Sequence, residues 1–389
     1  MQKLSSSLNG FGESVIRMMT RLSADNTINL AQGFPDFDPP EELLEALKNT
    51  ADHGPHQYEI TWGSKLFREL LSRKQSKLMG FEIDPEEEIV ITCGSTEAMM
   101  TAMKAICEPG DKVVIFSPFY ENYSADTILC GAEPIYVPLV PPEFCFDREE
   151  LRRAFEQKPK ALILCHPSNP TGKVFTREEL TYIAELAEEF DTYVITDEVY
   201  EHIVYEPNEY IYFASLPGMR RRTVCCSSLS KTYSITGWRI GYVIAPKEIA
   251  GVCKKVHDFL TVGAAAPLQK AAAAGLAFDD FYYQEFREMY TRKRDLFLRG
   301  LREAGLEFYE PQGAYYVLVD ISKFGYSSDL QFCKWLIQEI GVAAVPGSSF
   351  FQENVQNYIR LHFAKKDETL KEALRRLKKL KDFKETGGK

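Results

Sequence analysis

The sequence lacks an excess of positive charge and has no apolar run long enough to cross a membrane. Its 46 lysine and arginine residues are outnumbered by 56 aspartate and glutamate residues, which gives a formal net charge of -10. Nucleic-acid-binding proteins usually carry a basic face, so we expect no nucleic-acid partner. The first residues also lack the basic segment and apolar stretch of a signal peptide. We therefore expect a cytoplasmic protein that acts on small molecules and has no membrane partner.

Cysteine pairs with the spacing of a disulfide framework or a zinc site are also missing. The nine cysteines are scattered along the chain, and their number is odd. This pattern indicates reduced, mostly buried thiols and no metal site. With 389 residues, of which 45% are hydrophobic and 26% charged, the chain is long enough for two domains with sizeable cores.

One lysine stands in an unusual setting, the stretch 227–241. Lys231 follows Ser228 and Ser230, and Arg239 lies eight residues further on. A lysine amine becomes a nucleophile when burial or nearby cations disfavour its charge, and it can then form a Schiff base with an aldehyde. The two hydroxyls and the guanidinium are suitable partners for a phosphate. An aldehyde and a phosphate together indicate pyridoxal phosphate as the cofactor.

Two other interpretations of this stretch are open. Most lysines are exposed, so Lys231 could be a solvated residue of a polar loop. Ser228 and Lys231 also match the Ser-x-x-Lys pair of a serine acyl-transfer enzyme. That class uses Ser-Asp-Asn and Lys-Thr-Gly elements as well, and neither tripeptide occurs in the chain.

Strands and helices alternate through the middle of the sequence, which predicts a largely parallel sheet. Five expected strands lead directly into polar residues. They cover residues 88–92, 112–116, 161–165, 192–196 and 223–227. Ligands of open α/β sheets bind at the carboxyl ends of the strands, so the five following loops are expected to meet in one site.

The loops after these strands supply most of the candidate site residues. Three of them, Ser95, Thr96 and Glu97, open a helix whose free amides form an anion site. The later loops contribute Tyr120, Asn169, Asp197 and Tyr200 before the chain reaches Lys231. The fold class expected from this pattern is α/β, with a large domain whose mostly parallel sheet is flanked by helices.

A smaller α/β domain is expected from the two ends of the chain. We assign residues 1–45 to an N-terminal segment that joins it, 46–275 to the large cofactor-binding domain and 276–389 to a bridging helix and the small domain. Gly33, in a turn of the first segment, would let the backbone approach a ligand. Arg360 stands in the middle of an apolar strand. Either it pairs with a buried acid, or it binds a ligand carboxylate.

At these residues the chain resembles a known family, the class I pyridoxal-phosphate aminotransferases of the aspartate aminotransferase fold group (fold type I). The resemblance covers nearly the whole chain and rests on four motifs and one arginine. They are Asn169-Pro-Thr-Gly172, Asp197-Glu-Val-Tyr200, Ser228-Leu-Ser-Lys231, Gly237-Trp-Arg239 and Arg360. The resemblance implies an aminotransferase that acts as a homodimer with its sites at the interface.

The same resemblance implies a role for each site residue. Lys231 would carry the cofactor as a Schiff base and then shuttle the substrate proton. Asp197 would bind the pyridine nitrogen, and Asn169 and Tyr200 would bind the phenolic oxygen. The ring would stack on Tyr120. The phosphate would be held by Ser95, Thr96, Ser228, Arg239 and the Tyr58 of a second subunit. The substrate α-carboxylate would be held by Arg360, Asn169 and the backbone of Gly33.

The substrate class is predicted from two further comparisons with the family. The turn Gln-Gly-Phe-Pro-Asp-Phe resembles the kynurenine, glutamine and methionine aminotransferases. Dicarboxylate-specific members place a lysine at the position of Thr96 or an arginine within the stretch 257–269, and neither is present. We therefore predict a neutral, aromatic or sulfur-containing amino donor and a 2-oxo acid acceptor such as 2-oxoglutarate. An aspartate-type aminotransferase, which Arg17 would favour, and a lyase on the same fold are the alternatives.

Overall fold

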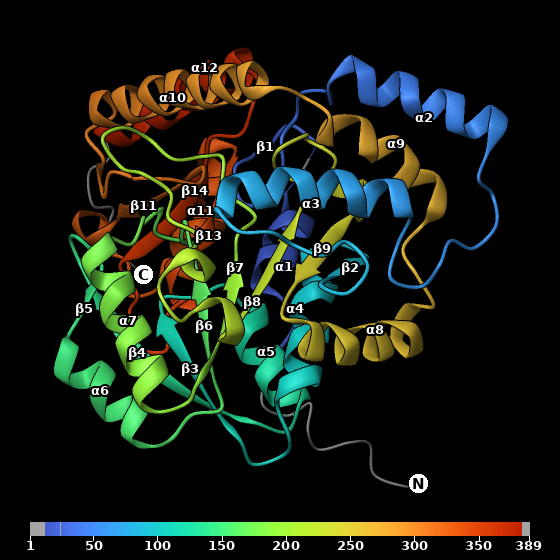
Figure 1. Cartoon of the computed structure of the whole chain (residues 1–389). Coiled ribbons are helices and arrows are strands. Elements are labelled where there is room, and N and C mark those ends of the chain that lie inside the picture. Colours follow the sequence, from blue (N-terminus) through green and yellow to red (C-terminus); the bar gives the residue numbers. More distant parts are fainter. Residues whose placement is uncertain (1–11, 24, 383–389) are drawn as a thin grey trace, which may run out of the picture.

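The computed structural model describes residues 12–23 and 25–382, and it is built around an eight-stranded mixed sheet (Figure 1). The strands are, in spatial order, β2 (Ile89–Thr92), β9 (Gly241–Ile244), β8 (Thr223–Ser228), β7 (Tyr193–Asp197), β6 (Ala161–Cys165), β3 (Lys112–Ser117), β4 (Glu133–Val140) and β5 (Cys145–Phe146). Strands β8, β7, β6, β3 and β4 are parallel, whereas β9 is antiparallel to both of its neighbours. Because β2 is antiparallel to β9, it runs in the same direction as β8.

The five strands that were expected to carry the site therefore end at the same edge of the sheet. Each lies within a residue or two of its predicted bounds. Strand β9 was not predicted, and it inserts between β2 and β8. The α/β fold with a mostly parallel sheet is confirmed.

Alternation of side chains along the strands gives the sheet two buried faces. In β3, Val113 and Ile115 belong to one core cluster, and Val114 and Phe116 to the other. The first face is covered by α4 (Ser95–Ile106), α5 (Asn122–Leu129) and α8 (Lys247–Thr261). The second is covered by α6 (Arg148–Glu156), α7 (Arg177–Glu189), α2 (Glu41–His53), α3 (Lys65–Met79) and α9 (Ala266–Leu276). The sheet is thus the middle layer of three.

A second, four-stranded sheet is formed by the C-terminal part of the chain. Its strands are β10 (Glu307–Phe308), β11 (Tyr316–Asp320), β14 (Tyr358–His362) and β13 (Val345–Pro346). The long helix α10 (Asp280–Glu303) packs against α12 (Asp367–Leu377), and both lie along the top of the molecule in Figure 1. The short helix α11 (Asp329–Trp335) packs beside β13 and β14.

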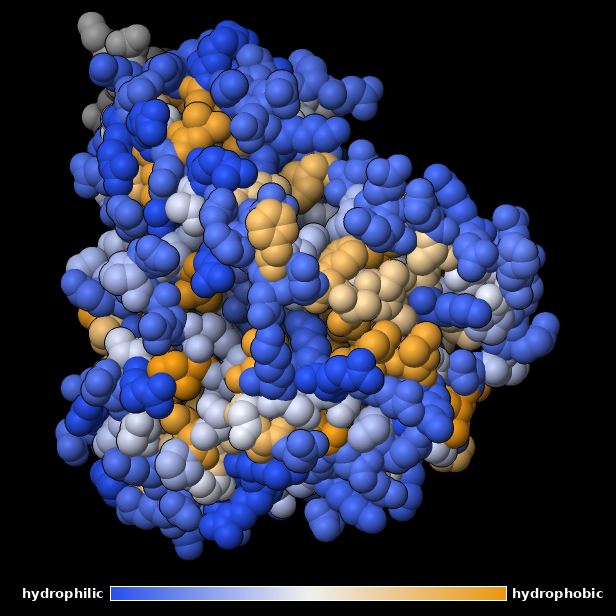
Figure 2. All heavy atoms as spheres, turned by 45° about the horizontal axis from the view of Figure 1, so that its top comes forward, coloured by the Kyte–Doolittle hydropathy of each residue, from blue (hydrophilic) through white to orange (hydrophobic). Residues whose placement is uncertain are grey.

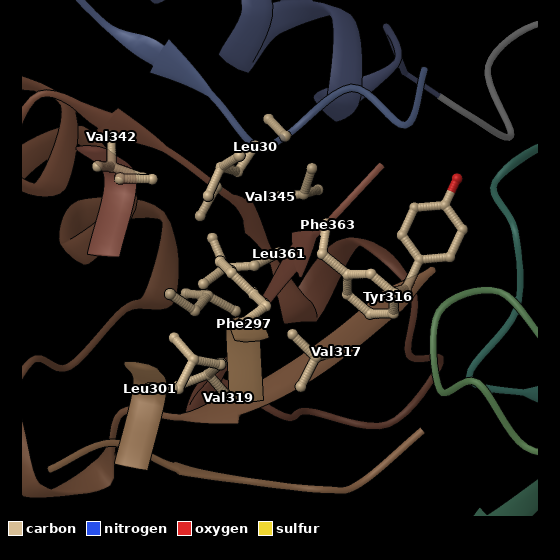
Figure 3. Packing of buried hydrophobic residues seen from close by; sticks show 14 of the residues in the cluster. Leu30, Phe297, Leu301, Tyr316, Val317, Val319, Val342, Val345, Leu361 and Phe363 are labelled. Carbon is tan, nitrogen blue, oxygen red and sulfur yellow. The ribbon is translucent and has the colours of Figure 1, made fainter. Parts of the chain in front are cut away.

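The N-terminal segment joins this C-terminal part. Strand β1 (Ile28–Asn29) pairs in parallel with β12 (Val342–Ala343), and α1 (Val15–Leu22) contacts β13 and α11. Figure 3 shows Leu30 of this segment above Leu361 and Phe297 in one hydrophobic cluster. Tyr316 lies at the edge of that cluster, with its hydroxyl group pointing away from it. The boundaries at residues 45 and 275 stay a prediction.

The cysteines are unpaired and differ in how deeply they are buried. All nine cysteines are free thiols, and six are buried, but Cys145 is exposed because it lies in the short edge strand β5. Figure 2 shows a mostly hydrophilic face with separate hydrophobic areas. Within residues 12–23 and 25–382, no helix is long and apolar enough to span a membrane, and no group of three or more metal-ligating side chains is found.

Candidate active site

A cavity of about 1220 Å³ opens at the edge of the sheet where the five strands end. Ligand sites usually enclose roughly 300 to 1,000 Å³, so this cavity has room for a cofactor and a substrate together. It brings together every candidate residue except Tyr58. The lining includes Gly33, Ser95, Thr96, Glu97, Tyr120, Asn169, Asp197, Tyr200, Ser228, Ser230, Lys231, Arg239 and Arg360. The convergence of the loops, inferred from strand direction, is therefore seen in the structure.

Lys231 stands on the loop that leaves β8 and points its amine into the cavity. The Nζ atom donates a hydrogen bond to the carbonyl oxygen of Gly33 at 3.0 Å. Burial lowers the pKa of this amine from 10.5 to about 8; the nearby Asp197 opposes that effect, and Arg239 and Arg360 add to it. The neutral amine therefore makes up about half of the population near pH 8, far below the pH that an ordinary lysine needs. That is the protonation state a nucleophilic amine needs.

Asp197 ends β7 and is buried at the floor of the cavity. The hydroxyl group of Tyr123 donates a hydrogen bond of 2.7 Å to its Oδ2 atom, and the Val199 amide lies 3.4 Å from Oδ1. Burial raises the pKa of this carboxyl group, while these two hydrogen bonds and Lys231 act in the opposite direction. A cationic partner in the cavity would favour the carboxylate further.

The start of α4 and the side chain of Arg239 form a cradle for an anion. Gly94 precedes α4 with a φ of 83°, and a Cβ atom there would lie 2.3 Å from the Arg239 Nη2 atom. A Cβ atom on Gly241 would lie 2.4 Å from the Gly94 carbonyl carbon. Arg239 itself has a left-handed backbone, with a φ of 55°. Two glycines and this conformation thus let the guanidinium approach the free amides of Ser95 and Thr96, where helix dipole and charge both attract an anion.

Hydroxyl groups from the lysine loop line the cavity near this cradle. Ser228 and Ser230 are both buried, and the Ser230 amide donates to the Ser228 Oγ atom at 3.3 Å. Serine hydroxyls can donate to a phosphate oxygen. The two serines predicted as phosphate ligands are therefore located on its wall.

Glu97 lines the cavity, but its carboxylate already has partners within the protein. Oε2 accepts from the Cys93 amide at 2.5 Å, and Oε1 lies 2.5 Å from His257 Nδ1. A glutamate in the first turn of a helix commonly binds such free amides. Its cofactor-binding role stays a prediction, and its present contacts stabilise the start of α4.

Arg360 is buried in the middle of β14, with 1% of its surface exposed. Nη1 donates to Asn169 Oδ1 at 2.7 Å, and Nη2 donates to the Ala31 carbonyl at 2.8 Å. Its guanidinium lies over the rings of Tyr316 and Phe350. In the part of the chain that the structure describes, no carboxylate pairs with Arg360, so the alternative of a buried acid partner is not seen.

Tyr200 and Tyr316 line the cavity, and Tyr315 packs against both rings without lining it. The hydroxyl groups of Tyr200 and Tyr316 lie 2.9 Å apart, and Tyr315 donates to the Gly33 carbonyl at 2.9 Å. A Cβ atom on Gly33 would lie 2.1 Å from the Tyr316 hydroxyl, so only glycine allows this approach. Tyr315 and Tyr316 were not predicted as site residues. The sequence feature that could have indicated them is the pair of tyrosines that follows Gly313-Ala314 at the start of a strand.

Tyr120 and Tyr58 lie in contrasting positions. Tyr120 lines the cavity and packs edge-to-face on Tyr123 at 5.8 Å between ring centroids. Tyr58 is 88% exposed and does not line the cavity of its own chain. Tyr58 can therefore contribute to an active site only if it contacts the cavity of a second chain.

The residues present fit pyridoxal phosphate. The cavity combines an amine with a lowered pKa, a buried carboxylate and an anion cradle that two glycines keep open. An aldehyde, a basic ring nitrogen and a phosphate are the chemical groups that such a set can bind. The fit rests on these side chains and is independent of sequence similarity.

Comparison with known proteins gives the same assignment. Residues 25–377 match the family described as aminotransferase class I and II. A probable N-succinyldiaminopimelate aminotransferase of Mycobacterium tuberculosis is 37% identical over 372 residues, which cover 92% of this chain and 93% of that protein. The methionine aminotransferase of Escherichia coli is 36% identical, with 96% and 98% covered. Kynurenine–oxoglutarate transaminase 1 of Homo sapiens is 35% identical, with 92% and 93% covered.

Solved structures of the two bacterial enzymes superpose on the chain along nearly its whole length. The Mycobacterium tuberculosis structure gives a TM-score of 0.93 at 36% identity, covering 97% of this chain and 100% of that one. The Escherichia coli structure gives 0.93 at 36% identity, covering 98% and 100%. The chain therefore belongs to the class I and II aminotransferases and is a transaminase that uses pyridoxal 5′-phosphate.

Proposed function

We propose that this transaminase moves the amino group of a neutral, aromatic or sulfur-containing L-amino acid to a 2-oxo acid such as 2-oxoglutarate. The observation that carries the proposal is the buried Arg360, whose charge has no acidic partner among the described residues and which lines the same cavity as Lys231. An arginine in that state is suited to bind a carboxylate in the two-pronged manner of its guanidinium. Beyond the anion cradle, no second buried cation lines the described cavity to hold a side-chain carboxylate.

The proposed roles divide the site into a cofactor end and a substrate end. At the cofactor end, Asp197 would hold the pyridine nitrogen, Asn169 and Tyr200 would hold the phenolic oxygen, and Tyr120 would pack against the ring. The phosphate would be held by Ser95, Thr96, Ser228, Ser230 and Arg239. Bound pyridoxal phosphate supplies an electron sink for the charge left on the substrate carbon. Asp197 supports this role because a carboxylate favours a protonated ring nitrogen.

At the substrate end, Arg360, Asn169 and the Gly33 backbone fix the α-carboxylate. This would place the substrate Cα proton within reach of one base, the Lys231 amine, which would accept that proton and later release it. The Lys231 amine now hydrogen-bonds to the Gly33 carbonyl. Gly33 is thus proposed to contact the substrate carboxylate and also accepts a hydrogen bond from Lys231. Substrate binding and the position of the lysine are linked through this residue.

The choice of donor is tested with a panel of amino acids. The three relatives are named for three different donors, so sequence identity alone does not select one. We expect phenylalanine, methionine or glutamine to convert the enzyme to its pyridoxamine form with a higher kcat/KM than aspartate. Far faster turnover of aspartate would show the aspartate-type alternative to be correct. Product formation without any 2-oxo acid would show a lyase.

Cofactor capture should depend on pH through Lys231. Its amine has a lowered pKa of about 8, so it is mostly protonated below that pH and mostly neutral above it. Only the neutral form is a nucleophile. The rate constant for capture of pyridoxal phosphate by the apoenzyme should therefore rise with pH and level off above about pH 8. A rate that keeps rising up to pH 10 would indicate a lysine with its ordinary pKa.

We further propose a homodimer in which Tyr58 reaches the phosphate of its partner's site. Several large apolar side chains are exposed in two nearby segments that a partner would cover. They include Tyr58 at 88%, Phe259 at 91%, Val262 at 51% and Ile60 at 42%. Thr61 donates a hydrogen bond to Asp258, which ties the two segments together. A cytoplasmic location stays a prediction from the sequence.

Mixed dimers test the role of Tyr58. We expect Tyr58→Ala to weaken cofactor binding, since it removes one phosphate donor. Subunits with Lys231→Ala and subunits with Tyr58→Ala are each impaired, but a hybrid has one site with both native residues. Unfolding and refolding the two variants together should therefore restore part of the activity. If Tyr58 served its own subunit, the hybrid would contain no intact site and the mixture would show no gain.

A further inference from the structure

A small hydrogen-bond network joins α8 to the start of α4, beside the anion cradle. It consists of Glu97, in the first turn of α4, and of His257 and Thr261, which lie one turn apart on α8. His257 Nδ1 lies 2.5 Å from Glu97 Oε1, and the Thr261 hydroxyl lies 3.2 Å from Nδ1 and 3.3 Å from Oε1. Glu97 and Thr261 line the cavity, whereas His257 is fully buried and does not line it.

His257 takes part in this network through one ring nitrogen. Its Nε2 atom is buried and has no hydrogen-bond partner among the described residues. A carboxylate only accepts hydrogen bonds, so the contact at Nδ1 is a bond that the imidazole donates to Glu97. Hydrogen bonds to a charged group are stronger than those between neutral groups. The histidine therefore fixes the orientation of the Glu97 carboxylate.

The orientation of Glu97 decides how its carboxylate affects the cradle. With Oε1 held from α8, Oε2 accepts the Cys93 amide at 2.5 Å. The carbonyl group of Cys93 in turn accepts from the Arg239 Nη2 atom at 3.4 Å. The helix amides that follow are left for an anion. A carboxylate that His257 did not hold would be free to turn toward the Arg239 guanidinium, where it would compete with the phosphate.

We propose that His257 is a positioning residue for the cofactor phosphate, and that it acts by holding Glu97 on the Cys93 amide. This inference rests on the proposed function, because it takes the start of α4 and Arg239 to bind that phosphate. His257 itself does not line the cavity. Its loss should therefore weaken the binding of phosphorylated ligands and leave the binding of unphosphorylated ones unchanged. A residue that only fills space in the core would affect both kinds of ligand alike.

Two amines that cannot form a Schiff base with Lys231 test the inference on the full-length apoenzyme. Pyridoxamine phosphate carries the phosphate, and pyridoxamine is the same ring without it. By calorimetry, we expect His257→Leu to raise the Kd of pyridoxamine phosphate about tenfold, near the lower end of what a hydrogen bond to a charged group contributes. The Kd of pyridoxamine should stay unchanged. Asparagine places an amide donor near the position of Nδ1, so His257→Asn should keep most of the affinity.

A double variant shows whether the effect passes through Glu97. In Glu97→Ala the carboxylate is absent, so adding His257→Leu should not change the Kd of pyridoxamine phosphate any further. A further loss as large as that seen in the native background would overturn the inference. Thr261→Val tests the same network without a change in side-chain size. It removes the second donor to Oε1 and should raise the Kd of pyridoxamine phosphate about threefold.

A matched control removes an imidazole that lies outside the network. His53 is exposed on α2 and does not line the cavity, so His53→Leu should change neither Kd. The inference is wrong if His257→Leu changes neither Kd or both equally, or if His257→Asn loses as much affinity as His257→Leu. The proposed phosphate cradle itself fails, and this inference with it, if the native apoenzyme binds the two amines equally well.

Discussion

Replacing Lys231 with alanine should lower the rate of transamination by about 10⁴-fold or more, since the amine serves both as nucleophile and as proton shuttle. The lysine is the only amine that lines the described cavity. Its lowered pKa, with a value of about 8, makes it available as a base near neutral pH. Single-turnover absorbance measurements with phenylalanine would report the loss, because they follow the substrate proton transfer directly.

Two controls separate the chemistry from folding. Lys270 is an exposed lysine of α9 outside the cavity, and Lys270→Ala should keep full activity. A small added amine such as ethylamine should restore part of the activity of Lys231→Ala, because it fits the space left by the side chain and can carry the proton. If Lys231→Ala loses less than tenfold, another base moves the proton and the assignment of Lys231 is wrong.

The sequence predicted the sheet well because its strands are short apolar runs that end in polar residues. Residues 161–165 match β6 at both ends, β7 is shifted by one residue, and β8 extends one residue beyond its predicted end. A pattern of apolar runs followed by polar residues does not predict the antiparallel orientation of β9. Its four residues, Gly241–Ile244, follow Arg239 closely, and their antiparallel place between β2 and β8 depends on pairings with residues far away in the chain.

The site was predicted residue by residue, but its internal contacts were not. The fold decides which carboxylate pairs with each basic side chain. Arg21, for example, pairs with Glu13, which lies eight residues earlier in the chain. The hydrogen bond from Tyr123 to Asp197 joins α5 to the end of β7 and has no local signal in the sequence. The loop sequence after β3 contained Tyr123, yet only Tyr120 was selected, since one helical turn separates two equally plausible aromatics.

The buried charge of Arg360 has no acidic partner among the described residues. Its guanidinium contacts two neutral groups, the Asn169 side chain and the Ala31 carbonyl. Burial of an uncompensated charge costs stability, and proteins retain such groups where a ligand supplies the opposite charge. A ligand carboxylate that paired with Arg360 would be attracted more strongly than one at the surface, because the pair would lie in a medium of lower polarity than water.

Replacing Arg360 with methionine should lower kcat/KM strongly while changing the free energy of unfolding little. The α-carboxylate loses its buried partner, so kcat/KM should fall by about 10² to 10³-fold for every amino acid, which corresponds to roughly 3 to 4 kcal/mol. The free energy of unfolding of the apoenzyme should change little, because removing a buried charge that has no acidic partner offsets the loss of the hydrogen bonds to Asn169 and Ala31. Chemical denaturation and steady-state kinetics on the same samples measure the two effects.

Arg68 provides the contrast that makes this test decisive. It is equally buried, but it donates to the carbonyls of Gly63 and Pro85 and pairs with Glu86 at 3.0 Å. Arg68→Met should therefore lower the free energy of unfolding by about 2 to 3 kcal/mol, because it leaves buried carbonyls without donors. It should leave kcat/KM nearly unchanged, since Arg68 does not line the cavity. If Arg360→Met destabilises the protein as much as Arg68→Met does, Arg360 is a structural arginine, and its claim to the substrate carboxylate fails.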